Sequence, residues 1–418
     1  MKKKVIIIGA GTVGLHCAFF LSQAGFEVEV IDDRAKDDYS NCSFGNCGYI
    51  TPSHFVPLAS PSMLQAGLKM LFDPTGPVYF PLSKNIKKLP WFMKFVRSAN
   101  SKQVREVAPT LYKLNEQSRK LYELLTLKYE AQSDLVENGL LMASVSEEGF
   151  KEEIELTEMA GLLGIETKIY RSGELKEIEP DLEFNIAGAV LYKSDAHIHP
   201  QKHMIWLRNR LIEDGVGIRD GIQIDRILTS KGRIESILAK DKVFRADEYV
   251  IAAGAKSSDL AKMAGIRLPV IAGKGYSTDF VDSAVKLHTP VILTEARVAL
   301  TPLKDGLRLG SGMEFSGETG HVRLRRVQAM LDRTHHAIPS IPSAEAEKLN
   351  IWEGLRPLSP DGVPFIGRTQ KLHNLLFATG HAMMGMSLGP VTGQIISDVI
   401  AGNKTDFNMN QLHPDRFS

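Results

Sequence analysis

The sequence predicts an α/β protein in which a Rossmann-type dinucleotide-binding domain is interwoven with an α+β domain built on an antiparallel sheet. The N-terminal residues follow a strand–turn–helix–strand pattern with a glycine-rich turn, as in the first unit of a parallel sheet. Residues 268–325 contain short alternating segments separated by turns such as Asp305-Gly306, which indicate antiparallel strands. A chain of 418 residues is long enough for both domains.

The first segment has every part of a dinucleotide-binding fingerprint. The apolar run from Val5 to Ile8 precedes a Gly-x-Gly-x-x-Gly turn, and a helix then leads to a second strand that ends at Asp32. The three glycines permit a tight turn, a close approach to a pyrophosphate, and close helix–strand packing, and the terminal carboxylate accepts ribose hydroxyls. We predict that an ADP-containing dinucleotide is held by Gly9, Ala10, Gly11, Thr12, Val13, Gly14, Asp32 and Asp33.

Composition limits the partners and the compartment. The formal net charge is only +1, whereas nucleic-acid binding needs a concentrated basic face, so we expect no nucleic-acid partner. The three cysteines form no even framework, and the apolar run behind Lys2–Lys4 is interrupted by glycines, so we expect a cytoplasmic protein without a cleaved leader. No run approaches the about 20 apolar residues of a spanning helix.

Later segments return to the first domain. A buried strand ends in Ala252-Ala253-Gly254, where small side chains let the backbone pass over a cofactor. The glycine-rich residues 380–390 lead into a final helix, predicted from Val391 to Ile400, whose N-terminus is a second cradle for a polarised group. We assign the cofactor-binding domain to residues 1–60, 197–262 and 345–418, and the substrate domain to residues 61–196 and 263–344.

The segment 61–99 has two interpretations. It combines apolar and aromatic residues, prolines and an excess of lysine. A helical cap packed on the substrate domain is the simpler one. A peripheral contact with a membrane is the alternative, because basic amphipathic segments lie well in a bilayer interface. The periodicity of residues 104–131 predicts a long helix directly after it.

Four segments carry a family resemblance over nearly the whole chain. They are the fingerprint, the loop from Cys42 to Pro52, the run Gly273-Lys274-Gly275-Tyr276-Ser277, and the run from Trp352 to Gly367 followed by Thr379-Gly380-His381. In this order they resemble the FAD-dependent amine and amino-acid oxidoreductases of the D-amino-acid oxidase superfamily. The likeness is greatest to bacterial D-amino-acid dehydrogenases of the small-subunit type.

The resemblance implies FAD as the cofactor and assigns residues to it. The loop after the fingerprint would line the flavin, Ile224 would meet the adenine through its backbone, and the turn after the buried strand would pass the diphosphate. The C-terminal loop would contact the isoalloxazine. The residues so assigned are Ser43, Asn46, Cys47, Gly48, Ile224, Ala253, Gly254, Gly380, Met383, Met384, Gly385 and Met386.

The resemblance also suggests residues that act on the substrate. Arg356 stands where relatives place the arginine that pairs with the substrate carboxylate, and its alternative role is a structural pair with Asp361. Tyr276 is a candidate donor to the same carboxylate or a core residue, and His54 is a candidate at the mouth of the site. Met383 replaces a second arginine that some relatives carry, which leaves a doubly held carboxylate in doubt.

Two other clusters have simpler interpretations. His197, His199 and His203 have a spacing that can hold a metal, but we expect turn and helix-start roles and no metal site. Cys42 and Cys47 could form a redox pair beside the flavin, although small apolar roles are more common for such cysteines.

The predicted activity is FAD-dependent oxidative deamination of a small amino acid, D-configured or cyclic such as D-proline or hydroxyproline, with hydride transfer to flavin N5. Such an enzyme serves amino-acid catabolism and passes electrons to a quinone or another acceptor. It would be cytoplasmic, either free in solution or in peripheral contact with the inner membrane. The alternatives are an oxygen-using oxidase of the glycine or sarcosine type and a non-catalytic flavin-binding subunit of a larger complex.

Overall fold

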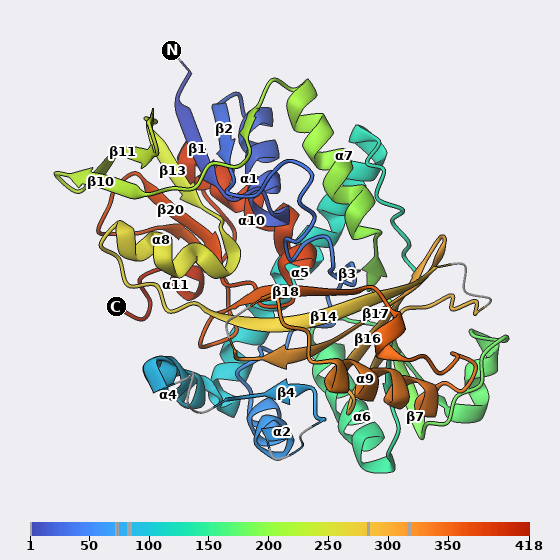
Figure 1. Cartoon of the computed structure of the whole chain (residues 1–418). Coiled ribbons are helices and arrows are strands. Elements are labelled where there is room, and N and C mark those ends of the chain that lie inside the picture. The colour runs from blue at the N-terminus through green and yellow to red at the C-terminus, as the bar shows by residue number, and fades with distance from the viewer. Residues whose placement is uncertain (1, 72, 74, 82–85, 282–284, 317–318) are drawn as a thin grey trace.

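Two large sheets organise the protein. The computed structural model describes residues 2–71, 73, 75–81, 86–281, 285–316 and 319–418. In Figure 1 the sheet that contains β1 lies in the upper part, and the long strands of the second sheet run across the molecule below it. The mixed α/β class with one parallel and one mostly antiparallel sheet confirms the predicted fold class.

The first sheet has the strand order β19-β20-β13-β1-β2-β9. All of its strands run parallel except β19, which is antiparallel to β20. Segments far apart in the sequence are therefore neighbours, as β1 lies between β2 and β13. The bounds are β1 (Lys4–Ile8), β2 (Glu27–Ile31), β9 (Gly217–Arg219), β13 (Glu248–Ile251), β19 (Phe365–Arg368) and β20 (Leu375–Thr379).

Both faces of this sheet are covered, which explains why β1 is apolar at every inner position. Val5 and Ile7 pack toward helices on one face, and Ile6 and Ile8 pack toward a small meander and a helix on the other. The first face carries α1 (Thr12–Gln23), α5 (Ser101–Tyr129), α7 (Pro200–Glu213) and α10 (Gly385–Ala401). The second carries β10 (Arg226–Ser230), β11 (Arg233–Ala239), β12 (Lys242–Phe244) and α8 (Ser257–Met263).

The second sheet has the order β18-β14-β17-β16-β15-β5-β7-β6, with β4 beside β17. Its pairs are antiparallel except β15 with β5 and β17 with β4. The helix α9 packs on one face, and α6 and part of α5 pack near the other. The bounds are β4 (Val78–Tyr79), β5 (Leu140–Ser144), β6 (Thr167–Arg171), β7 (Gly188–Tyr192), β14 (Ile271–Val281), β15 (Val291–Leu293), β16 (Val298–Leu303), β17 (Gly306–Glu314), β18 (Ile351–Leu358), α6 (Glu147–Leu162) and α9 (Leu324–Ala337).

The remaining elements are short. The segment 61–99 forms the two helices α2 and α4 at the edge of the molecule, at the bottom of Figure 1. The two-stranded pair β3–β8 joins the first loop to the start of α7. The bounds are α2 (Pro61–Leu71), η1 (Ile86–Lys88), α4 (Leu89–Ser98), β3 (Tyr49–Ile50), β8 (Ala196–His197), η2 (Ser172–Glu177), η3 (Gly254–Lys256), η4 (Ala346–Lys348) and α11 (Met409–Leu412).

The final helix begins earlier than predicted. The sequence prediction placed its start at Val391, directly after Pro390, but α10 begins at Gly385 and contains the proline. Proline lacks the N–H that would bond the carbonyl of Met386. That carbonyl instead accepts a hydrogen bond from the Tyr122 hydroxyl (2.7 Å), so the proline leaves it satisfied.

The division into domains stays a prediction. The strand β18 lies within residues 345–418, which were assigned to the cofactor-binding domain, yet it pairs with β14 in the second sheet. The long helix predicted at 104–131 is confirmed as α5. Among the described residues, no helix is both long and apolar enough to cross a bilayer.

Candidate active site

The glycine-rich turn between β1 and α1 is fixed by backbone packing at two of its glycines. Gly9 has a φ of 112°, and a Cβ there would lie 2.5 Å from the carbonyl oxygen of Ala252. A Cβ on Gly14 would lie 1.9 Å from the carbonyl oxygen of Gly9. Both positions therefore require glycine for the fold itself, whatever is bound nearby.

Gly11 differs from the other two glycines. A Cβ there would meet only the Ser43 hydroxyl, at 3.5 Å, and the backbone angles (φ −75°, ψ 175°) suit any residue. No protein atom therefore accounts for a glycine at this position. The open space beside Gly11 is where the fingerprint expects a pyrophosphate to approach the backbone.

Two helix N-termini meet beside this turn. Thr12, the first residue of α1, has its hydroxyl 3.5 Å from the sulfur of Met386 in the first turn of α10. The helices approach closely because a Cβ on Gly389 or Gly393 would lie 2.7 Å or 2.5 Å from atoms of His16. Neither first turn holds an acidic residue. Backbone N–H groups and two positive dipole ends thus favour an anionic or polarised group here.

Asp32 directly follows β2 and lies next to the turn. Its carboxylate accepts hydrogen bonds from the backbone N–H groups of Ala10 (2.6 Å) and Arg34 (2.8 Å). A hollow of about 650 Å³ opens beside it, with Ala10, Asp32 and Tyr39 in its lining. The carboxylate is therefore held by the glycine turn at the rim of an open hollow, where the fingerprint places the ribose.

The other residues assigned to the ADP half lie around Asp32. The backbone N–H of Ile222 donates to the carbonyl of Asp32 (2.8 Å). This hydrogen bond brings the buried Ile224 to the end of β2. Ala253 and Gly254 form the turn after β13, and a Cβ on Gly254 would meet no atom within 4 Å. The Asp33 carboxylate forms an ion pair with a lysine of the same turn. Their contacts with a cofactor stay predictions.

The loop assigned to the flavin connects the two helix N-termini. The Ser43 hydroxyl accepts a hydrogen bond from the backbone N–H of Thr12 (2.9 Å). The Asn46 side chain accepts from the N–H of Gly48 (2.7 Å) and donates to the carbonyl of Met383 (3.3 Å). The structure therefore brings this loop together with the C-terminal loop that precedes α10, as the resemblance implied.

The two cysteines of this loop are protonated packing residues in this structure. Cys42 donates its thiol hydrogen to the carbonyl of Leu355 (2.7 Å). Cys47 lies over β17, where a Cβ on Gly310 would be 2.5 Å from its sulfur. Burial raises the pKa of both thiols, that of Cys42 to about 11. Neither is a thiolate at neutral pH and neither is bridged, so these contacts do not support a redox pair.

Arg356 lies on β18, on the sheet face that meets the flavin loop. Its guanidinium occupies the space above Gly275 of β14, where a Cβ would be 2.2 Å from the guanidinium carbon. One terminal nitrogen donates to the carbonyl of Gly312 on β17. Burial lowers the pKa of the guanidinium below its ordinary value, and the nearby thiols of Cys42 and Cys47 offset this only in part.

The structural partner considered for Arg356 is wrong. The Asp361 carboxylate pairs with Arg416 near the C-terminus, at 2.7 Å and 2.9 Å. Within the described part of the chain, no carboxylate forms an ion pair with Arg356, whereas Arg308 on β17 of the same sheet pairs with Asp279 (2.7 Å). Arg356 is therefore a cation with hydrogen-bond donors left for a ligand.

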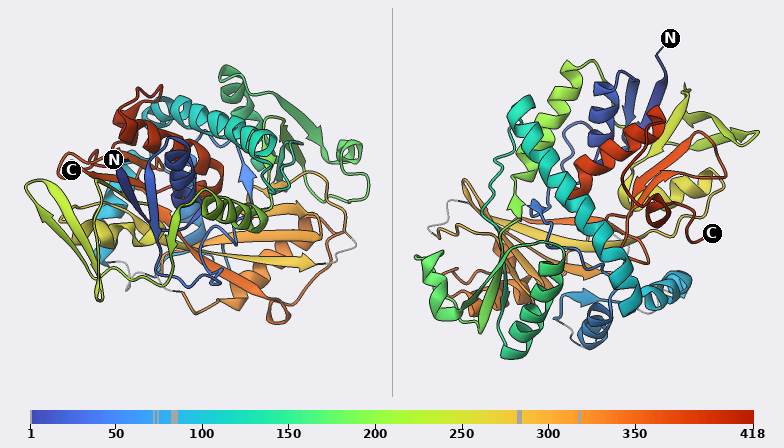
Figure 2. Two further views of the ribbon diagram at one scale, coloured as in Figure 1. Left: turned by 90° about the horizontal axis from the view of Figure 1, so that it is seen from above. Right: turned by 180° about the vertical axis from the view of Figure 1, so that it is seen from behind.

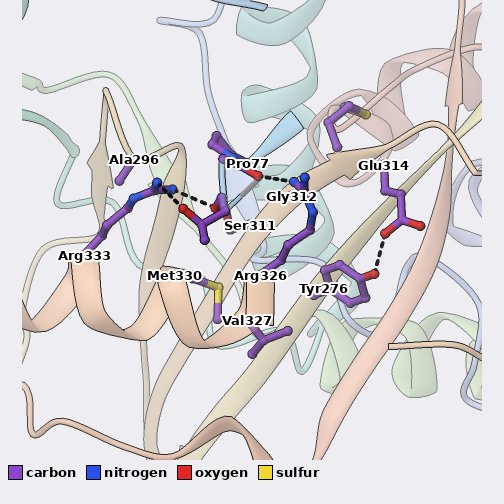
Figure 3. A pocket seen from close by; sticks show the side chains of 13 residues that line it. Pro77, Tyr276, Ala296, Ser311, Gly312, Glu314, Arg326, Val327, Met330 and Arg333 are labelled. Atoms are coloured by element: carbon purple, nitrogen blue, oxygen red, sulfur yellow. Dashed lines mark hydrogen bonds between the residues drawn. The ribbon is translucent and has the colours of Figure 1, made fainter. Parts of the chain in front are cut away.

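Tyr276 lies on the other face of the same sheet. Its hydroxyl donates to the Glu314 carboxylate (2.7 Å), and its ring packs in the core cluster that contains Val327 and Met330 of α9 (Figure 3). A hollow of about 380 Å³ on that face includes Tyr276 in its lining and does not include Arg356. The structure gives Tyr276 a core role, so these contacts do not support its donation to a carboxylate held by Arg356.

His54 forms its hydrogen bond with Ser53 and not with Arg356. Its ring nitrogen lies 3.1 Å from the Ser53 hydroxyl, and the charge that acts on it is Arg297, at the start of β16. Three strand spacings of about 4.8 Å separate the backbones of β18 and β16. Burial lowers the pKa of His54 to about 4 and that of His381, which bonds a threonine hydroxyl, to about 3. Both histidines are neutral at pH 7.

The other histidines have structural partners. The His199 ring accepts from the N–H of Lys202 and caps α7, and His197 lies in β8. His203 meets His16, with their Nε2 atoms 3.2 Å apart in the interior between α1 and α7. Within the described ranges, no group of three His, Cys, Asp or Glu residues is arranged to hold a metal. The His16–His203 pair has no signal in the sequence, because only the packing of α7 on α1 brings the rings together.

The glycine turn, Asp32 and the two helix N-termini fit the diphosphate and ribose of a dinucleotide. Residues 4–399 match the family model described as FAD dependent oxidoreductase. The chain belongs to this family. FAD is accordingly its cofactor, and the space beside Gly11 with the two helix N-termini suits the diphosphate of that cofactor.

Curated relatives match along nearly the whole length. The chain is 30% identical over 401 residues to a D-amino acid dehydrogenase of Helicobacter pylori strain ATCC 700392 / 26695, covering 96% of this chain and 95% of that protein. It is 29% identical over 413 residues to a D-amino acid dehydrogenase of Dechloromonas aromatica strain RCB, covering 96% of this chain and 98% of that protein. The family resemblance read from the sequence is thus confirmed.

Solved structures share the fold. Glycine oxidase from Geobacillus kaustophilus superposes with a TM-score of 0.77 at 21% identity, covering all of both chains. L-proline dehydrogenase from P. horikoshii superposes with a TM-score of 0.78 at 19% identity, covering 100% of this chain and 98% of that one. At these identities the likeness supports the fold and carries no information on the substrate.

Proposed function

We propose that this FAD-dependent oxidoreductase is a dehydrogenase of small D-amino acids, including cyclic ones such as D-proline or hydroxyproline. The observation that carries the proposal is Arg356, a cation on the cofactor-facing side of the second sheet without a carboxylate partner in the described chain. A planar guanidinium with free donors matches a carboxylate by two parallel hydrogen bonds. The similarity to proteins named D-amino acid dehydrogenase supports the D configuration.

The chain's own residues would bind and orient the substrate. Arg356 would hold the carboxylate, and Gly275 leaves the space in which the guanidinium turns toward it. When bound, FAD supplies the electron acceptor for the oxidation. The substrate loses its α C–H hydrogen with the bonding electron pair and one N–H proton. The resulting imine is hydrolysed to a 2-oxo acid and ammonia, or remains in the ring of a cyclic substrate.

The amine is expected to arrive in its neutral form. His54 and His381 have lowered pKa values, so neither is a charged acid at pH 7, and neither contacts Arg356 in the structure. Catalysis therefore depends on positioning the α C–H rather than on a strong base. The rate should rise with pH as the free amine becomes the major form of the substrate.

Bleaching of the flavin tests the activity directly. The purified protein is mixed anaerobically with D-alanine, D-proline, L-alanine, L-proline or glycine, and the loss of yellow absorbance is followed. We expect fast bleaching by one or both of the D-amino acids and slow bleaching by the L-forms. Fast bleaching by L-proline or glycine alone would contradict the proposed substrate class.

The electron acceptor is proposed to be a quinone rather than oxygen. The similarity to proteins named as dehydrogenases supports this, and so does the basic, apolar segment 61–99, since quinones dissolve in bilayers. Such an acceptor requires a cytoplasmic protein to approach a membrane by a peripheral contact. Production of peroxide at the dye-linked rate in aerated buffer would instead favour an oxidase.

A further inference from the structure

A stripe of exposed apolar side chains runs along η1 and α4. Its members are Ile86, Leu89, Met93 and Val96, which we call the α4 stripe. Their exposed fractions are 75%, 57%, 61% and 53%, although each is a large aliphatic side chain. Spacings of three, four and three residues place them on one side of a helix. Transfer of these side chains from water into an apolar environment would be favourable in free energy.

The opposite side of α4 anchors the helix to the protein. Trp91 is buried, and its indole N–H donates to the carbonyl of Pro269 just before β14 (3.1 Å). The ring of Phe92 contacts the rings of Phe80 and Phe315, with centroids 4.5 Å and 5.4 Å apart. The α4 stripe therefore points outward from a fixed helix, which lies at the edge of the molecule in Figure 1 and in the right-hand view of Figure 2.

The chain around α4 is almost free of acidic residues. Between Asp38 and Glu106 the sequence holds a single acid, Asp73, while the whole chain is nearly neutral. Arg97, next to the stripe, is exposed, and the side chain of Lys102 is 80% exposed. Basic residues are thus concentrated in this stretch: Lys69, Lys84, Lys87, Lys88, Lys94, Arg97, Lys102 and Arg105.

Apolar burial and positive charge together select the partner. An aliphatic stripe flanked by basic side chains matches a bilayer that contains anionic lipid, where the stripe enters the acyl boundary and the cations meet the headgroups. A second copy of this chain would bring the same positive charge to the contact, which disfavours a symmetric dimer there. We propose that the α4 stripe docks the protein on an anionic membrane surface. This inference rests on the proposed function, because the docked protein would meet its quinone acceptor in that membrane.

Vesicle flotation tests the docking. The FAD-loaded protein is mixed with vesicles of phosphatidylcholine alone or of phosphatidylcholine with phosphatidylglycerol. We expect binding to the anionic vesicles only, reduced by salt. The double variant Leu89→Glu, Met93→Glu should lower the bound fraction at least about tenfold, because it removes apolar contact and adds repulsion. Its dye-linked activity in solution should equal that of the unaltered protein, since both side chains are exposed and neither belongs to the proposed site.

A matched control separates the stripe from a change in net charge. Leu127 on α5 and Leu162 at the end of α6 are 84% and 88% exposed, and Leu127→Glu with Leu162→Glu adds the same two charges elsewhere. This control should bind anionic vesicles nearly as well as the unaltered protein. Equal losses in both double variants would overturn the role of the stripe, as would binding that survives Leu89→Glu, Met93→Glu.

Two further results would also overturn the proposal. Absence of binding to either vesicle would refute membrane docking, and a solution dimer dissociated by the α4 double variant would show that a second copy covers the stripe. Binding of the α4 stripe to an acidic protein, without binding to vesicles, would show that the partner is a protein and not a lipid surface. Failure of the proposed activity is distinguishable, because it would appear as absent flavin bleaching with D-amino acids while vesicle binding persisted.

Discussion

Replacing Arg356 by alanine is the sharpest test of the proposed site. The guanidinium donates to the Gly312 carbonyl and has no carboxylate partner in the described chain, so alanine leaves no buried acid unpaired. The loss should therefore appear in substrate binding and catalysis rather than in folding. FAD should stay bound, because no atom of Arg356 is needed by the glycine turn that receives the cofactor.

The magnitude follows from the contact that is removed. Taking away one partner of a hydrogen-bonded charge pair in a partly dry site costs roughly 2–5 kcal/mol. The value of kcat/KM for a D-amino acid should therefore fall about 30- to several-thousand-fold. Arg356→Lys should recover only part, because an ammonium cannot donate to Gly312 and also hold a carboxylate in the bidentate geometry. An amine substrate without a carboxyl group should be nearly indifferent to either change.

Arg416→Ala supplies the contrasting variant. Arg416 pairs with Asp361 through two hydrogen bonds in a largely buried setting, so its loss leaves that carboxylate without its partner. We expect a lower melting temperature and little change in kcat/KM for Arg416→Ala, and the reverse pattern for Arg356→Ala. Steady-state kinetics with thermal unfolding of both variants measures this. If Arg356→Ala kept its activity and lost only thermal stability, the substrate role of Arg356 would be refuted.

Three other outcomes are expected. Gly11→Val should fold but lose FAD, because its side chain meets only the Ser43 hydroxyl and fills the space of the diphosphate. Gly14→Val should fail to fold, because its side chain would collide with the backbone of Gly9. Circular dichroism and flavin content distinguish the two variants, and a Gly11→Val protein that keeps its flavin would contradict this prediction. Gly275→Ala should lower kcat/KM about 100-fold at unchanged flavin content by displacing the guanidinium, and unchanged kinetics would mean that its position is uncritical. Burial lowers the pKa of His16 to about 4 and that of His203 well below its ordinary value, so the neutral pair stabilises the fold above pH 6.5 and loses this as pH falls toward 4. Urea unfolding at pH 7 and pH 5 should show His16→Gln to be less acid-sensitive by about 2 kcal/mol, and an identical acid response would contradict the assigned pKa.

The cofactor half of the site was predictable because its signals are local. The turn from Gly9 to Gly14 and Asp32 lie within one strand–helix–strand unit, where spacing alone determines what meets what. The start of α10 could not be predicted in this way, because Pro390 is a helix-breaking signal in the sequence. Only the hydroxyl of Tyr122, far away in the chain, satisfies the carbonyl that the proline leaves.

The substrate half depends on contacts between distant segments. Nearness in sequence suggested Asp361 as a partner of Arg356, but the packing of the C-terminus gives Asp361 to Arg416. Tyr276 follows Gly275 directly, yet alternation along β14 places its ring on the face covered by α9. No local pattern shows which face of this sheet meets the cofactor.

The contact of α10 with α1 has a consequence for the order of events in the cell. The first helix and the last long helix meet across a separation of 374 residues at Thr12 and Met386, and the cofactor-binding end of the first sheet also needs β20. A ribosome must release almost the whole chain before these surfaces can join, and contacts of such long range form slowly. Flavin is therefore acquired only after α10 has been synthesised and has packed on α1, and retained yellow colour reports that this contact has formed.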